Sequence, residues 1–176
     1  AAVDDGLLAI NSSTGVVSFL SAPNFESPSD QGADNTYNFT VIASDGSASS
    51  SIAMSVAVSN LNESPLFSVS SSQTYVENSG VSISVAANDQ DASASVSYSL
   101  SGLDASKFSI SSSGALSFAS APDYENPSDN GANNVFNVSV TASDGSSSSS
   151  VSLVISLSDD TTDNFGIQLP VNVAIA

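Results

Sequence analysis

Residues Ser120–Gly145 read SAPDYENPSDNGANNVFNVSVTASDG, and they repeat an earlier stretch, Ser21–Gly46, which reads SAPNFESPSDQGADNTYNFTVIASDG. About 16 of 26 positions are identical, at an offset of about 99 residues. A period of this length corresponds to a whole domain rather than to a short-repeat solenoid. The 176-residue chain is therefore predicted to carry two copies of one domain in tandem.

Both copies alternate apolar and polar residues over short segments. In the second copy Phe136, Val138 and Val140 share one face of an extended segment, and the first copy repeats this pattern. Two loops, Ser29–Gly32 and Ser128–Gly131, are predicted to be turns capped by Asp and Asn side chains. We therefore expect an all-β fold of Ig-like Greek-key β-sandwich repeats, with about seven strands in the second copy.

The two copies differ in completeness. The first copy lacks counterparts of three segments of the second copy that are predicted to be strands, near Phe67–Glu77, Val81–Ala87 and Val96–Leu100. Half a sandwich exposes its inner face and an open sheet edge. We expect either a piece of a longer array or a half-domain that strands from another chain complete. The predicted organisation is a partial repeat with C-terminal strands only (1–60), a linker (61–65), a complete repeat (66–160) and a C-terminal strand segment (161–176).

The C-terminal segment has a strand-like pattern of its own. Val171, Val173 and Ile175 alternate with smaller or polar residues. It either opens a further repeat or is donated to the incomplete first half of a neighbouring copy, which would give a head-to-tail filament.

Composition limits the chemistry of the chain. It has a formal net charge of −17, one Lys or Arg in total, and no His, Cys or Trp. These counts argue against Cys–His nucleophiles, zinc sites with the usual ligands and disulfides, so we do not expect an enzyme. Such a charge would repel nucleic acid, and no apolar run approaches the roughly 20 residues of a membrane span. Asp, Asn, Ser and Glu supply the oxygen ligands that calcium prefers.

The acidic residues fall in short patterns near the predicted strand ends. Asp123 and Glu125 lie two residues apart, as do Asn24 and Glu26, so each pair points to one side of an extended chain. This order of motifs resembles cadherin-type repeats, in the bacterial cadherin-like form found in large surface proteins. The residues that match the family pattern are Glu77, Asp89 and Asp91, Asp123 and Glu125, Asp144, and the linker residues Asn60, Asn62, Glu63 and Pro65.

The resemblance implies that calcium binds at the junction between successive repeats. The implied junction ligands are Asn24, Glu26, Asn60, Asn62, Glu63, Asp89, Asp91 and Asp144. A second set, at the far end of the complete repeat, comprises Glu77, Asp123, Glu125 and Asp159. Asn replaces the family's Asp at Asn24 and Asn60, which lowers the ligand charge.

The leading functional hypothesis is an extracellular structural or adhesive module, stiffened by calcium, in a long bacterial surface adhesin or a filament. Its expected partners are neighbouring repeats or other copies of itself, and a cell-surface or glycan ligand. The alternative is a carbohydrate-binding accessory module of a secreted polysaccharide-degrading protein. Because Tyr98, Tyr124 and Phe136 are predicted to lie in the core and the chain has no Trp, the aromatic platform typical of sugar binding is not expected.

Overall fold

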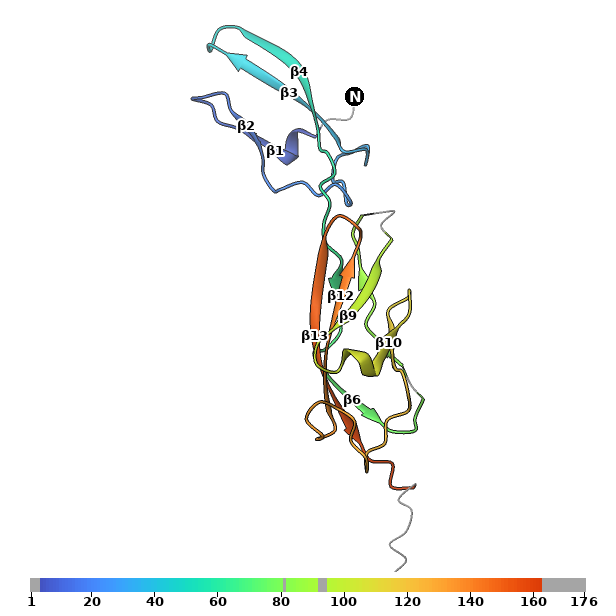
Figure 1. Ribbon diagram of the computed structural model, residues 1–176. Helices are drawn as coiled ribbons and strands as arrows, with labels where there is room; N and C mark the ends of the chain where they lie inside the picture. Colours follow the sequence, from blue (N-terminus) through green and yellow to red (C-terminus); the bar gives the residue numbers. More distant parts are fainter. Residues whose placement is uncertain (1–3, 81, 92–94, 163–176) are drawn as a thin grey trace, which may run out of the picture. The chain divides into compact units, whose positions relative to one another are not determined.

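The computed structural model describes residues 4–80, 82–91 and 95–162 (Figure 1). Every regular element in this part of the chain is a β-strand or a short 3-10 helix, which confirms the predicted all-β class. The contacts divide the chain into two compact units, Ala1–Asn62 (unit 1) and Glu63–Ala176 (unit 2). Each unit is described by itself below.

Unit 2 is built on a four-stranded sheet in the order β6-β13-β12-β9. The long strands β12 (Val135–Ser143) and β13 (Ser148–Ser158) form an antiparallel hairpin at its centre. At one edge β9 (Ser97–Ser101) pairs antiparallel with β12, and at the other β6 (Ser72–Val76) pairs parallel with β13. A neighbour therefore covers each outer edge of the hairpin.

Shorter strands complete unit 2. A three-stranded sheet joins β10 (Phe108–Ile110), β11 (Ala115–Phe118) and β7 (Ile83–Ser84). A small two-stranded sheet pairs β5 (Leu66–Phe67) with β8 (Ala87–Asn88). If β5 with β6, and β7 with β8, are each counted as one interrupted strand, the total equals the predicted seven.

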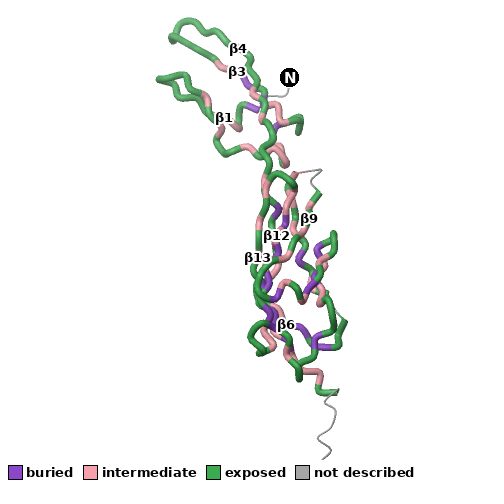
Figure 2. Tube along the Cα trace, viewed as in Figure 1, coloured by how far each residue is buried: buried purple, intermediate pink, exposed green. Residues whose placement is uncertain are grey.

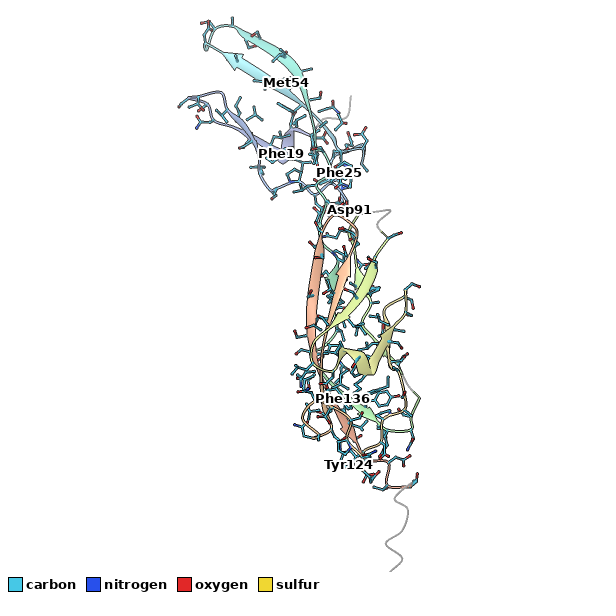
Figure 3. The ribbon with its side chains drawn as sticks, in the orientation of Figure 1. Phe19, Phe25, Met54, Asp91, Tyr124 and Phe136 are labelled. Carbon is cyan, nitrogen blue, oxygen red and sulfur yellow. The ribbon has the colours of Figure 1, made fainter. Side chains whose placement is uncertain are left out.

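The core of unit 2 lies on the inner faces of these sheets. Buried residues alternate with outward Ser and Thr along β12 and β13, because side chains of a strand point alternately to its two faces (Figure 2). Phe118 packs edge-on against both Phe136 and Tyr75, with ring centroids 5.0 and 4.8 Å away (Figure 3 labels Phe136). On the outer face, the hydroxyls of Ser139 and Ser152 lie 2.8 Å apart.

Unit 1 contains only the second half of this fold. Its strands are β1 (Leu8–Ile10), β2 (Val17–Phe19), β3 (Thr36–Ser44) and β4 (Ser49–Ala57). They form two separate antiparallel pairs, β1-β2 and β3-β4, which correspond in sequence order to β10-β11 and β12-β13. Among the described residues of unit 1, no strand takes the place of β6, β7 or β9. The C-terminal segment that is predicted to be a strand, Phe165–Ala176, lies outside the described residues.

Several apolar residues of unit 1 are exposed at positions that unit 2 buries. Leu153 of β13 is 1% exposed, whereas Met54, its counterpart in β4, is 46% exposed. Ile52 is 61% exposed, although its counterpart Val151 packs against the core of unit 2. The same positions of the repeat are thus buried in one unit and open in the other.

One buried Asp in each unit connects distant segments, a role that sequence reasoning missed. The carboxylate of Asp104, 2% exposed, accepts hydrogen bonds from the backbone N–H groups of Asn130 and Asn137, both at 2.7 Å. Asp4 accepts from Gln31 and Asn38 in the same way, both at 2.8 Å. The repetition of this Asp before each 3-10 helix was the signal available in the sequence.

The two predicted Asx-type turns are present. Asp129 accepts hydrogen bonds from the N–H groups of Gly131, Asn133 and Asn134 at 2.8 to 3.1 Å. Burial acts to raise the pKa of Asp129, but these backbone donors outweigh it and hold the pKa below the usual 3.8. Asp30 has the same arrangement and the same direction of shift.

The lowered pKa predicts a pH-dependent effect of Asp129→Asn. A carboxyl group whose pKa is lower in the folded state stabilises the fold above its unfolded pKa, and that contribution disappears as the pH falls through the folded pKa. We expect the variant to melt at a lower temperature than the wild type at pH 6. The difference should shrink as the pH falls from 6 toward about 2, through the folded pKa of Asp129, which lies below 3.8. Calorimetric melts at both pH values would measure it, and an equal difference at both would contradict the assignment.

The core of unit 2 predicts the outcome of a matched pair of substitutions on β13. Ile155 is fully buried and its neighbour Val154, on the other face, is 41% exposed. Ile155→Ala should lower the free energy of unfolding by about 2–5 kcal/mol, since it removes buried methyl groups and leaves a cavity. Val154→Ala should cost less than about 1 kcal/mol. Urea unfolding followed by tyrosine fluorescence would compare them, and similar losses would contradict the assigned inner face.

Candidate metal sites

Three carboxylates of the second predicted set meet at the far end of unit 2. In the parallel pair of β6 and β13, Val76 lies opposite Ser158, so the next residues, Glu77 and Asp159, leave the sheet side by side. Glu125 joins them from the long connection between β11 and β12. One carboxylate oxygen of each of Glu77, Glu125 and Asp159 lies within 4.8 Å of the others. We call these three residues the far-end cluster.

Glu77 is the fixed member of this cluster. Its side chain is 1% exposed, and its two carboxylate oxygens accept the backbone N–H groups of Tyr124 at 2.6 Å and Asp160 at 3.0 Å. Its own N–H donates to the carbonyl of Ser158 at 3.2 Å. The carboxylate is therefore held in one position by the ends of two other segments.

The far-end cluster fits a calcium ion. Ligand oxygens lie about 2.3–2.6 Å from calcium, so oxygens on opposite sides of one ion are about 5 Å apart. A separation of up to 4.8 Å lets all three carboxylates contact the same ion. Without a cation, each pair of charges at about 4 Å would repel by roughly 4 kcal/mol at an effective dielectric constant of 20.

Asp123, the fourth residue predicted for this site, is not among the clustered carboxylates. Its Oδ1 accepts the N–H of Asn126 at 3.1 Å and so closes the turn that carries Glu125. Beside the cluster, the hydroxyl and backbone N–H of Thr162 hold the pKa of Asp160 below its usual value. Asp160 therefore adds negative charge next to Glu77.

The leading end of unit 2 brings together three residues predicted for the junction. The backbone N–H of Asp91 donates to Oδ1 of Asp89 at 2.9 Å, and the N–H of Glu63 donates to Oδ2 of Asp91 at 3.2 Å (Figure 3 labels Asp91). Oδ2 of Asp89 is buried and has no hydrogen-bond partner in the described part of the chain. A buried carboxylate oxygen normally has a partner, so a cation would satisfy this atom.

Asp144 and its counterpart Asp45 both cap hairpins. Oδ1 of Asp144 accepts the N–H groups of Ser146 and Ser147, both at 2.6 Å, at the turn between β12 and β13. The carboxylate of Asp45 accepts hydrogen bonds from the backbone N–H groups of Ser47 and Ala48. These two donors lower the pKa of Asp45, and the N–H of Ala48 has the larger effect. These carboxylates stabilise turns in addition to any role as ligands.

The other junction ligands belong to unit 1. Oδ1 of Asn24 accepts the N–H of Glu26 at 2.9 Å, which holds these two predicted ligands in one turn. Asn60 and Asn62 lie in a segment without regular structure. The complete junction set therefore stays a prediction.

Comparisons with known proteins bear on the fold. No family model and no curated protein matches the chain. Human protocadherin-24 repeats EC1-2 superpose with a TM-score of 0.55 at 24% identity, over 87% of this chain and 77% of that one. Drosophila N-cadherin EC1-4 gives a TM-score of 0.55 at 21% identity, over 90% of this chain and 39% of that one.

Protocadherin Gamma B7 extracellular cadherin domains 1-4 give a TM-score of 0.54 at 21% identity, over 88% of this chain and 39% of theirs. Helices long and apolar enough to cross a membrane do not occur in the described part of the chain. The structural similarities show that this chain has a cadherin-like β-sandwich fold.

Proposed function

We propose that the chain is an adhesive structural module of an extracellular surface protein, stiffened by calcium at the ends of its repeats. The far-end cluster of Glu77, Glu125 and Asp159 carries this proposal, because three carboxylates within 4.8 Å of one another match the ligand chemistry of calcium. The cadherin-like fold supports it, since proteins with this fold include the cadherin ectodomains described above.

In the proposed mechanism, calcium makes the flexible connection between two successive repeats rigid. Short polar connections between domains leave the domains free to move unless something ties them together. A calcium ion bound by side chains of two successive repeats and their linker would restrict that motion. The predicted junction ligands Asn24, Glu26, Asn60, Asn62, Glu63, Asp89, Asp91 and Asp144 would act in this way. Bound ions would also offset part of the net charge of −17.

The expected setting is the surface of a bacterial cell, with neighbouring repeats or further copies of the chain as partners. The carbohydrate-binding alternative gains no support from the described residues, where Tyr124 is the one aromatic side chain that is exposed, at 37%. The prediction that Tyr124 lies in the core is wrong, because its side chain is exposed. A single partly exposed ring does not make a platform for a sugar chain. We propose no catalytic role.

Calcium binding is tested by removing one carboxylate from the far-end cluster. At about 10 mM calcium and a Kd of about 100 μM, each site should stabilise the fold by roughly 2.7 kcal/mol. The melting temperature of the wild type should rise with calcium and fall with excess chelator. Glu125→Gln should reduce that rise and remove one site from a calorimetric calcium titration.

Asp34→Asn is the matched control, since it removes the same charge from a turn of unit 1 outside both predicted sites. It should retain the full calcium response. An unchanged melt in excess chelator, or equal losses in the two variants, would contradict the proposed site.

The adhesive role is tested separately with beads that carry the full chain. We expect the beads to aggregate in about 2 mM calcium, a concentration above the millimolar Kd of the weakest extracellular sites, and to disperse with chelator. Asp91→Asn should weaken aggregation, because Asp91 is a predicted junction ligand. Magnesium at the same concentration serves as the control cation. Beads that stay dispersed in calcium while the protein still binds the ion would reject adhesion between copies and leave calcium binding intact.

A further inference from the structure

Unit 2 has a polar hollow beside its short 3-10 helix η2 (Ala105–Lys107). The hollow measures about 390 Å³. Small-molecule sites measure about 300–1,000 Å³, so it has room for a ligand at the lower end of that range. The other lining residues come from the end of β11 and from the connection that follows this strand. Most of the lining side chains are polar or charged, and these are Ser106, Lys107, Ser120, Asp123, Asn126 and Ser128.

Lys107 is the only basic residue of the chain. Among the described residues, no carboxylate forms an ion pair with Lys107, although the sequence contains 18 Asp and Glu. The backbone carbonyl of Lys107 accepts the N–H of Ala119 at 2.8 Å, and in unit 1 the carbonyl of Leu7 accepts the N–H of Leu20 at 3.0 Å. Because Leu serves at the corresponding position, the ammonium group of Lys107 is not needed for this contact and is available to a ligand.

Asp123 brings a negative charge to the same hollow. Its Oδ1 accepts the N–H of Asn126 at 3.1 Å, and its Oδ2 makes no hydrogen bond within the described part of the chain. Lys107 and Asp123 therefore line one hollow without pairing with each other. The hollow offers one positive group and one acceptor oxygen of opposite charge, with Phe118 as an apolar part of its wall.

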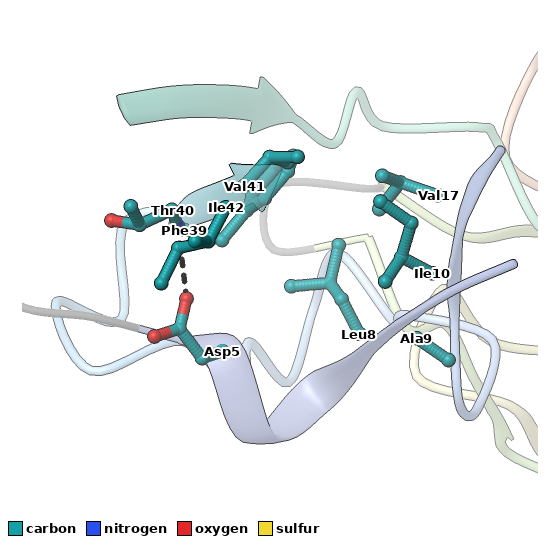
Figure 4. A pocket seen from close by; sticks show the side chains of 9 residues that line it. All are labelled: Asp5, Leu8, Ala9, Ile10, Val17, Phe39, Thr40, Val41 and Ile42. Carbon is teal, nitrogen blue, oxygen red and sulfur yellow. Dashed lines mark hydrogen bonds between the residues drawn. The ribbon is translucent and has the colours of Figure 1, made fainter. Parts of the chain in front are cut away.

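Unit 1 has a hollow of a different kind, which measures about 270 Å³ (Figure 4). Apolar side chains such as Leu8, Ile10 and Val17 make up most of its lining. Its one charged residue, Asp5, accepts the N–H of Thr40 at 2.9 Å. No basic residue lines this hollow, so the presence of both charges distinguishes the hollow of unit 2.

The matching positions of unit 1 indicate that the shared fold does not require the two charges. Leu7 stands where unit 2 has Lys107, and Asn24 stands where unit 2 has Asp123. Oδ1 of Asn24 accepts the N–H of Glu26 at 2.9 Å, so an amide oxygen can also close this turn. The two charges are therefore specific to unit 2, and a ligand accounts for them better than the common architecture does.

We propose that this hollow binds a small zwitterion, such as a free polar α-amino acid. The carboxylate of the ligand contacts the ammonium group of Lys107, and the ammonium group of the ligand contacts Oδ2 of Asp123. Both contacts are charge-assisted hydrogen bonds, which are shorter and stronger than neutral ones. The Ser hydroxyls and the amide of Asn126 can donate and accept hydrogen bonds, so they suit a ligand with a polar side chain.

The net charge of the chain favours a zwitterion over a simple anion. A chain with a charge of −17 repels an approaching anion, whereas a zwitterion carries no net charge. A simple cation would be attracted to carboxylates throughout the chain and repelled by Lys107. Only a ligand that carries both signs uses both charges of the hollow.

Nuclear magnetic resonance can observe Lys107 alone, because labelling of lysine gives a single side-chain signal in this chain. L-glutamine would be titrated into the full chain after removal of metal ions on a chelating resin. We expect the lysine signal to shift and to saturate at millimolar L-glutamine. N-acetyl-L-glutamine lacks the ammonium group and L-glutamine amide lacks the carboxylate, so each should bind at least about tenfold more weakly.

Two variants install the residues of unit 1 and should therefore keep the fold. Lys107→Leu and Asp123→Asn should each weaken L-glutamine binding at least about tenfold in calorimetric titrations, with melting temperatures close to that of the wild type. A double variant, Lys107→Leu with Ser112→Lys, keeps the net charge of −17 and moves the cation to the turn between β10 and β11. This double variant should not recover binding.

Three results would overturn the proposal. These are the absence of a saturable shift of the Lys107 signal with L-glutamine, equal binding of either blocked compound, and recovery of binding in the double variant. Because metal ions are absent throughout, the outcome does not depend on calcium binding at the far-end cluster.

Discussion

The parallel pairing of β6 with β13 is the constraint on which the core and the far-end cluster of unit 2 both depend. It places Tyr75 against Phe118 in the core, and it brings Glu77 and Asp159 out of the sheet side by side. A shift of one residue in the register of β6 against β13 would turn Tyr75 away from the core and separate Glu77 from Asp159. Core packing and ligand geometry are thus set by the same register.

Unit 1 illustrates the consequence of losing that pairing. Its β3-β4 hairpin matches β12-β13 in length and register, since cross-strand hydrogen bonds and a tight turn suffice for a hairpin. Its inner face is nevertheless open, because a sandwich needs strands at both edges of the hairpin to enclose side chains such as Met54. Positions that unit 2 buries are therefore exposed in unit 1.

The acidic residues of the chain divide into two structural classes. Asp30, Asp45 and Asp129 accept several backbone N–H groups, which lower the pKa of each, and they stabilise turns. Glu77, Glu125 and Asp159 instead converge with carboxylate oxygens within 4.8 Å of one another, an arrangement that could hold a cation. Residues of both classes look alike in the sequence, because each is an Asp or Glu near a strand end. Asp123 was therefore predicted to be a far-end ligand, although its side chain closes a turn.

The sequence by itself determined the all-β class and the duplication, and it singled out Glu77, Glu125 and Asp159, whose carboxylates lie close together. These features follow from local periodicity and from motif order, which are properties of neighbouring residues. The tertiary structure alone decided that Asp4 and Asp104 are buried anchors and that Tyr124 faces solvent. It also decided which carboxylates meet, because convergence depends on strand register and loop path across segments as distant as Glu77 and Asp159. Local sequence patterns do not specify those distances.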